Sequence, residues 1–258
     1  MERRTFLKTS AVVAGATLTA PGLQANPVPG DEKDFYELKA FQLTGGGSKN
    51  QMKQYYTEAV IPFLNKRGAK VGAFYEYSLD EPPKMYILHA HKSPADYYDA
   101  VQAMKTDSGF LAAAKTYMNL PAANPVFVRY ETFLMEAFDA IPRLKKPEKS
   151  RGLFELRTYE SYNEDAGIRK VKMFNDEELP LFEKVGLHPV FFGQLLAGPQ
   201  MPALVYMLWF NDMAERDANW AKFSSSSEWN TMRNKPEYAN TVSKVNRKFL
   251  IPADFSQI

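Results

Sequence analysis

The stretch Leu153-Phe154-Glu155-Leu156-Arg157-Thr158-Tyr159-Glu160 decides the fold, because Phe35-Tyr36-Glu37-Leu38-Lys39-Ala40-Phe41 carries the same pattern earlier in the chain. Aligning Glu37 with Glu155 gives an offset of 118 residues. Three further pairs coincide at this offset: Pro62 and Pro180, Gly68 and Gly186, and Phe74 and Phe192. Self-similarity at a fixed offset indicates a duplicated structural unit. The chain is therefore predicted to contain one module twice.

Each module is predicted to run strand, helix, strand, strand, helix, strand. In the first module the strands are expected over 35–43, 70–77, 84–91 and 126–138, and the helices over 48–66 and 94–118. In the second module the strands are expected over 152–161, 188–196, 202–210 and 245–251, and the helices over 168–185 and from 214 onward. Pro62 and Pro180 should kink the first helix of each module near its last turns.

This element order defines the fold class. A β-α-β-β-α-β unit forms a ferredoxin-like antiparallel sheet with helices on one face, and its other face needs a cover. Residues 85–88 are apolar on both faces of their strand, which favours two sheets that cover each other over two separate domains. We predict an α+β fold in which two tandem ferredoxin-like modules form an intrachain dimeric α/β-barrel. The predicted segments are a signal peptide (1–25), a linker (26–34), a degenerate first module (35–140), a linker (141–150) and the second module (151–258).

Composition excludes several classes of function. The chain has 258 residues, of which 45% are hydrophobic, enough for a sizeable core. Its net charge is +2 with dispersed Lys and Arg, so no footprint for nucleic acid is expected. Cysteine is absent, which excludes disulfides, thiol catalysis and thiolate-bound metals.

The N-terminus is typical of an export signal. Arg3-Arg4-Thr5-Phe6-Leu7-Lys8 precedes a small, apolar run over 11–20, and the pattern resembles the twin-arginine signal, although Glu2 stands where Ser or Thr is usual. The apolar run is too short to span a bilayer, which needs about 20 residues. We expect export to the periplasm or an equivalent compartment, cleavage after Ala25 and no stable membrane span afterwards. Retention as an uncleaved anchor is the alternative.

Several stretches of the second module resemble NIPSNAP domains, which belong to the dimeric α/β-barrel superfamily. They are 154–159, 187–193, 204–210, Trp220 and Glu228-Trp229. The first module resembles a degenerate copy. The resemblance implies the barrel fold. It does not imply a reaction, because the superfamily includes monooxygenases, haem proteins, isomerases and proteins without known catalysis.

The first strand of the second module carries candidate site residues. Glu155, Arg157 and Tyr159 share one face and would point into the barrel if the other face met the helices. An acid, a cation and a phenol together could orient a polar group of a ligand. The alternative is a structural pair of Glu155 and Arg157, repeated by Glu37 and Lys39.

The three histidines are the next candidates. His89 and His91 lie two apart on a predicted strand, so both rings project from one face at a spacing that suits a metal. They are weak metal candidates, because a third ligand is needed and only Asp96 and Asp99 are near in sequence. At an offset of 120 their counterparts are Trp209 and Asn211, which excludes a duplicated metal site. His188 could transfer protons, bind haem iron axially or simply stabilise a turn.

These residues lead to three functional hypotheses. The first is binding of a small, largely apolar molecule between sheet and helices, with oxygenase- or isomerase-like activity on it. In this hypothesis Arg157 holds an oxygen, Tyr159 and His188 transfer protons, and Tyr206 and Trp209 contact the ligand. The second is a noncatalytic interaction protein that presents its outer helices, and the third is a haem-binding barrel. The sequence requires no cofactor, and a monomer or a homodimer is compatible with it.

Overall fold

The computed structural model describes residues 33–258, except 46 and 149–151. The predicted signal peptide over 1–25 and nearly all of the linker over 26–34 lie outside the described residues. The two modules form one compact unit.

Both modules have the predicted order of elements. The first contains β1 (Phe35–Leu43), α1 (Ser48–Tyr55), η1 (Tyr56–Val60), α2 (Ile61–Asn65), β2 (Lys70–Glu76), β3 (Met85–His91), α3 (Pro94–Ala103), α4 (Ser108–Ala113), α5 (Lys115–Met118) and β4 (Phe127–Ala137). The second contains β5 (Leu153–Glu160), α6 (Glu164–Met173), η2 (Phe174–Glu178), α7 (Leu179–Val185), β6 (His188–Ala197), β7 (Ala203–Phe210), α8 (Met213–Ser225), α9 (Ser227–Met232), η3 (Pro236–Tyr238) and β8 (Lys244–Pro252).

Local sequence explains where several helices begin and end. The Ser93 hydroxyl accepts a hydrogen bond from the backbone N–H of Asp96 at 3.1 Å, which caps α3 just before its Pro94. Asp212 caps α8 in the same way. Gly68 and Gly186 follow the first helix of each module with φ values of 77° and 82°. These left-handed conformations favour glycine, which explains its recurrence at this position.

A π-helical turn interrupts the first helix of each module. η1 and η2 span 56–60 and 174–178, so they too obey the offset of 118 residues. Each π-helical turn ends two residues before a proline, which is Pro62 in the first module and Pro180 in the second. Because proline lacks an N–H and its ring crowds the carbonyl four residues earlier, the helix widens locally by one residue. The kink expected near Pro62 and Pro180 therefore takes the form of a π-helical turn just before each proline.

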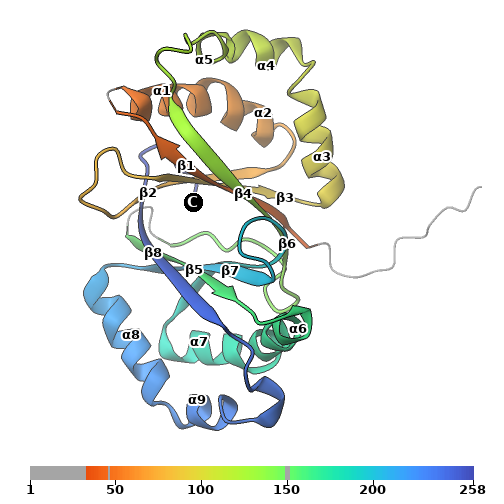
Figure 1. The fold of residues 1–258 in the computed structure, drawn as a ribbon, viewed down its shortest axis with the longest axis vertical. Coiled ribbons are helices and arrows are strands. Elements are labelled where there is room, and N and C mark those ends of the chain that lie inside the picture. Colours follow the sequence, from red (N-terminus) through yellow and green to blue (C-terminus); the bar gives the residue numbers. More distant parts are fainter. Residues whose placement is uncertain (1–32, 46, 149–151) are drawn as a thin grey trace, which may run out of the picture. The chain divides into compact units, whose positions relative to one another are not determined.

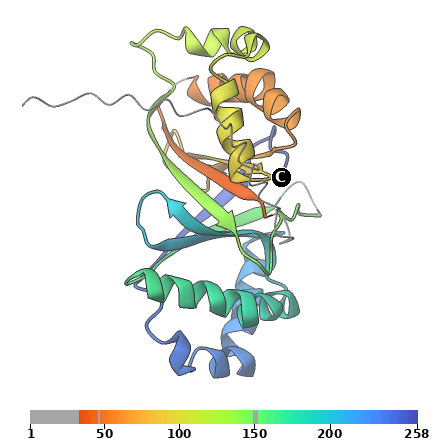
Figure 2. The ribbon, with the colours of Figure 1, turned by 90° about the vertical axis from the view of Figure 1, so that its right-hand side faces the viewer.

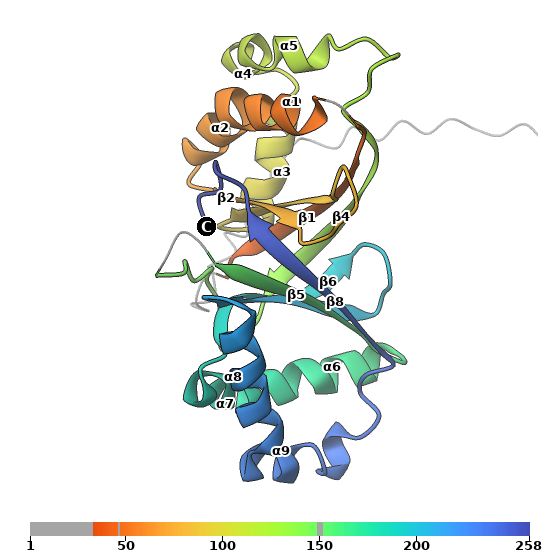
Figure 3. The ribbon, with the colours of Figure 1, turned by 90° about the vertical axis from the view of Figure 1, so that its left-hand side faces the viewer.

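The eight strands close into one antiparallel barrel in the order β1-β3-β2-β8-β5-β7-β6-β4. Each module supplies four adjacent strands, and the modules join where β2 pairs with β8 and β4 pairs with β6. Closure leaves no exposed sheet edge. The helices of the first module cover one side of the barrel and those of the second module cover the opposite side (Figure 1). The views from either side show the same layers (Figures 2 and 3).

Three apolar cores hold the layers together. The barrel interior combines side chains of both modules, among them Leu38, Phe74, Leu88, Phe154, Met207 and Leu250. A second core lies between sheet and helices of the first module, and a third lies in the same place in the second module. The third is rich in aromatic rings: Phe192 and Tyr206 stack at 4.5 Å between centroids.

One expectation about strand faces is wrong. Phe154 and Leu156 point into the barrel, whereas Arg157 and Tyr159 point toward the helices. The interior takes the apolar face of β5 because the two sheets pack on each other there, around a pocket of about 290 Å³ that reaches Leu156 and Thr158. Polar side chains then occupy the helix-facing side, where helix-borne partners and solvent are in reach.

Candidate functional site

A pocket of about 510 Å³ lies between the sheet and the helices of the second module. β5 supplies Arg157 and Tyr159, and the helical side supplies the other polar and aromatic groups. The lining comprises Arg157, Tyr159, Lys170, Glu178, Arg216, Trp220, Ala221, Phe223, Ser224, Trp229, Val242 and Val245. Aromatic walls with a few convergent polar groups are typical of sites for small molecules.

Glu155 does not line the pocket, but it binds two residues that do, Arg216 and Trp220. Its carboxylate is fully buried and accepts hydrogen bonds from Nε and Nη2 of Arg216 at 2.8 and 3.1 Å and from Nε1 of Trp220 at 2.8 Å. Nε of Arg157 lies 3.5 Å from Oε1 of the same carboxylate. The predicted structural pairing of Glu155 and Arg157 is thus present, but Arg216 is the closer partner. Glu155 holds α8 against β5.

A buried ion pair forms the opposite side. Nζ of Lys170 donates a hydrogen bond to Oε2 of Glu178 at 2.6 Å, and both side chains are almost fully buried. The ammonium also lies 4.4 Å from the ring centroid of Phe174. Burial raises the pKa of Glu178, and the charge of Lys170 opposes that rise. The Lys170 ammonium is therefore paired with the Glu178 carboxylate inside the protein.

Arg157 is the cation that faces the pocket with the weakest carboxylate contact. Its guanidinium carbon lies 4.2 Å from the ring centroid of Trp220 and 5.5 Å from that of Tyr159. Its buried Nε has no hydrogen-bond acceptor among the residues that the structure describes. A guanidinium that lines the pocket between aromatic rings is suited to bind an anionic or carbonyl oxygen.

Tyr159 lines the pocket beside Arg157, and Tyr206, expected to contact a ligand, lies behind it and does not line the pocket. The Tyr206 hydroxyl donates a hydrogen bond to the Tyr159 hydroxyl at 2.9 Å, and Tyr206 is completely buried. Burial raises the pKa of both phenols, of Tyr206 well above its ordinary value. Tyr159 can therefore donate its own proton to a ligand while Tyr206 supports it.

The structure does not bring His188 and Trp209 to this pocket. They face each other across β6 and β7, with ring centroids 5.8 Å apart, and Trp209 belongs to the barrel interior. Nε2 of His188 lies 3.7 Å from Glu215. The reason is strand alternation: Trp209 lies three residues after Tyr206, so the two side chains point to opposite faces. This odd spacing of Tyr206 and Trp209 could be read from the sequence.

Lys170, Glu178 and Arg216 were not foreseen as site residues. Residues 170 and 178 lie about 80° apart around a regular α-helix, which does not suggest contact. The π-turn η2 takes up one extra residue, so they behave as if separated by seven and fall on nearly the same face. No local sequence signal reveals this shift.

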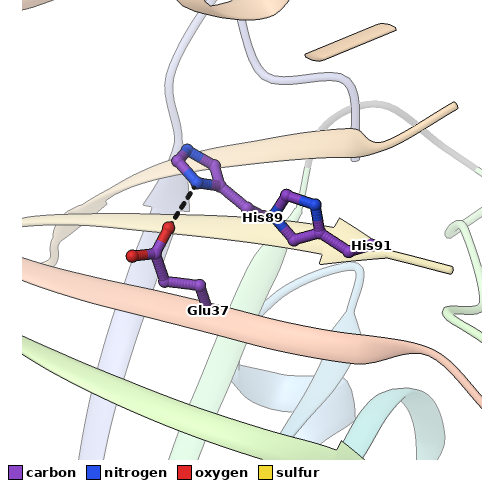
Figure 4. A group of neighbouring side chains, drawn as sticks. All are labelled: Glu37, His89 and His91. Carbon is purple, nitrogen blue, oxygen red and sulfur yellow. Dashed lines mark hydrogen bonds and ion pairs between the residues drawn. The ribbon is translucent and has the colours of Figure 1, made fainter. Parts of the chain in front are cut away.

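In the first module, His89 and His91 meet Glu37 on the helix-facing side of the sheet (Figure 4). Nδ1 of His89 lies 2.8 Å from Oε2 of Glu37, and Nζ of Lys39 lies 3.2 Å from Oε1. Burial lowers the pKa of His89 and lowers that of His91 to about 4. Burial alone would raise the pKa of Glu37, but His89 and Lys39 outweigh it and lower the pKa to about 2.

The strand register corrects two expectations about these histidines. Glu37 pairs with His89 across β1 and β3, as Glu155 pairs with Leu208 across β5 and β7. The counterparts of His89 and His91 are thus Leu208 and Phe210, not Trp209 and Asn211. The side chain that joins the histidines is Glu37 on the neighbouring strand, not Asp96 or Asp99.

The closed barrel of two ferredoxin-like halves with outer helices defines the class: the protein is a dimeric α/β-barrel built within one chain. Residues 154–257, nearly all of the second module, match the NIPSNAP family. Residues 1–20 match the twin-arginine translocation pathway signal sequence, which directs the chain to export.

Solved structures share this fold. A candidate monooxygenase from Lactobacillus acidophilus is 9% identical with a TM-score of 0.57, and the match covers 86% of this chain and 94% of that one. A candidate monooxygenase from Fusobacterium nucleatum is 10% identical, with a TM-score of 0.55 and coverage of 85% and 92%. An anthrone oxidase-like protein is 6% identical, with a TM-score of 0.52 and coverage of 88% and 94%. No curated protein matches the sequence. Across the described residues, every helix is too short or too polar to cross a bilayer.

Proposed function

We propose that the protein binds a small, largely apolar molecule with one anionic or carbonyl oxygen in the pocket of the second module. Arg157 and the Tyr159 hydroxyl hold that oxygen, and Trp220 and Trp229 contact the apolar body. The observation that carries this proposal is Arg157, a buried guanidinium between aromatic rings that faces a cavity of about 510 Å³. The cavity favours ligand binding over a protein that only presents its outer helices.

Glu178 supports a reaction on the bound molecule. It lines the same pocket as Arg157, and burial raises its pKa, which suits a general base near neutral pH. Glu178 would remove a proton from a ligand carbon close to the ligand oxygen. Arg157 would stabilise the negative charge that develops on that oxygen. An isomerase-like reaction returns this proton to another carbon, and an oxygenase-like reaction lets the carbanion react with dioxygen. The related folds described as monooxygenases and as anthrone oxidase-like favour the oxygenase-like form.

Binding can be tested with anilinonaphthalene sulfonate, an aromatic anion whose fluorescence rises in apolar sites. We expect saturable binding to the wild type and an affinity at least about tenfold lower in Arg157→Gln, because a charge-assisted hydrogen bond is lost. Lys39→Gln is the matched control, since Lys39 has the same place in the first module. Equal affinities of wild type and Arg157→Gln would remove the proposal.

Turnover can be tested with anthrone. Its oxidation by one dioxygen gives anthraquinone and one water, so oxygen uptake and quinone absorbance should rise in step. We expect Glu178→Gln to abolish turnover while the sulfonate probe still binds. Turnover unchanged in Glu178→Gln would exclude that residue as the base. Haem binding remains the third hypothesis, and His188 does not support it because it lies outside this pocket; a Soret band in the exported protein would revive it.

A further inference from the structure

Glu37, His89 and His91 form a compact cluster of metal-ligating side chains in the first module, remote in sequence from the pocket residues. All three are at most 5% exposed. One ligand atom of each lies within 4.8 Å of the others. β1 and β3 place them together because Glu37 is paired with His89 in the strand register, and His91 follows two residues later on the same face. Figure 4 shows the carboxylate and both rings on the same side of the sheet.

The hydrogen bonding of this cluster is incomplete. Nε2 of His89 and Nε2 of His91 are buried and have no partner among the residues that the structure describes. Each unpaired buried polar atom costs about 1–3 kcal/mol. A purely structural role does not require two such rings, since the second module builds the same sheet with Leu208 and Phe210 at these positions.

We propose that Glu37, His89 and His91 bind one divalent transition-metal ion. Two imidazoles and one carboxylate are a ligand set used for zinc and non-haem iron(II). Mg²⁺ and Ca²⁺ are disfavoured because they prefer oxygen ligands throughout. Ligands about 2.1 Å from a metal lie about 3.0–3.5 Å apart. The ligand atoms of this cluster lie within 4.8 Å of one another, so binding one ion requires side-chain shifts that bring them closer together.

Neighbouring groups shape this site. Lys39 holds Oε1 of Glu37 at 3.2 Å, which leaves Oε2 directed toward His89. The ring of Tyr56 in η1 lies 6.0 Å from that of His89, and the ring of Tyr97 in α3 lies 5.5 Å from that of His91. Because these rings cover the cluster, the ion would be held away from bulk solvent and would tie β1 to β3.

The test uses the full chain, freed of metal with a chelator and titrated with Co²⁺ and with Zn²⁺. We expect one equivalent of either ion to bind, Co²⁺ to give visible absorption bands, and Zn²⁺ to raise the melting temperature. The key variant is His89→Leu/His91→Phe, which installs the residues of the second module and so suits the fold. It should bind more than about 100-fold more weakly.

Two controls make the result decisive. His188→Ala removes the exposed third histidine and should bind metal as the wild type does. Circular dichroism should show that the double variant is folded. Absence of binding to the metal-free wild type, or equal affinity in the folded double variant, would overturn the proposal.

Discussion

Glu37 and Glu155 occupy the same position in the two modules, yet their surroundings differ. Glu155 is held by Arg216 and Trp220 from helix α8. Glu37 instead meets His89 from the neighbouring strand. A buried carboxylate must be paired wherever it lies, and the two copies provide that pairing from different elements. In the second module, helix α8 supplies the partners of the carboxylate and also lines the pocket. In the first module, strand β3 supplies the partner, and the result is a candidate metal centre.

The largest difference between the copies should appear when the carboxylate loses its charge. Glu155→Gln removes the carboxylate next to Arg157, whose side chain is 13% exposed, and leaves Arg216 paired with Asp217 alone. We expect it to lower the free energy of unfolding by about 3–5 kcal/mol. Glu37→Gln in metal-free protein should cost less, about 1–3 kcal/mol, because the one cation it leaves behind, Lys39, has a side chain 22% exposed and stays in contact with solvent. Urea unfolding with chelator present measures both, and equal losses would contradict the comparison.

Lys170 and Glu178 can be exchanged for their counterparts in the first module, Met52 and Val60, which are both buried. Lys170→Met alone leaves a buried carboxylate unpaired and should cost about 3–5 kcal/mol. Lys170→Met/Glu178→Val leaves no unpaired charge, so it should cost clearly less than the single change. A double-mutant cycle by chemical denaturation gives the coupling. Additive losses would show that the pair does not act as a unit.

The phenol pair offers a smaller test, since the first module has Phe41 and Ile87 at the positions of Tyr159 and Tyr206. Tyr159→Phe leaves the Tyr206 hydroxyl buried without an acceptor and should cost about 1–3 kcal/mol. Tyr159→Phe/Tyr206→Phe removes both hydroxyls and should be more stable than Tyr159→Phe alone. Thermal unfolding ranks the variants, and a less stable double variant would refute the pairing.

The smallest effect concerns alkaline pH. Burial raises the pKa of Tyr206 well above its ordinary value of about 10, so the folded state keeps a proton that the unfolded state releases. Stability from this group is complete below pH about 10 and is lost as pH rises further. Tyr206→Phe should reduce that loss by up to about 1.4 kcal/mol per pH unit. Unfolding curves at pH about 9 and about 11 compare the wild type with Tyr206→Phe. An equal loss of unfolding free energy in both proteins would contradict the raised pKa of Tyr206.

The duplication and the barrel could be predicted from sequence, because an offset of 118 residues and strand alternation persist over whole elements. The face of β5 that enters the barrel could not, since alternation gives two faces without saying which one meets the helices. The contact of Lys170 with Glu178 depends on a π-turn, and that of Glu37 with His89 depends on cross-strand register. Sequence spacing alone encodes neither.

Native mass spectrometry of the exported protein tests the central claim, that the two copies of one module carry different sites. Wild type, His89→Leu/His91→Phe and Arg157→Gln would be compared in parallel. We predict that the wild type carries one metal ion and one small organic molecule, that the histidine variant loses only the ion, and that Arg157→Gln loses only the molecule. A wild type that carries neither adduct, or a single variant that loses both, would contradict the account.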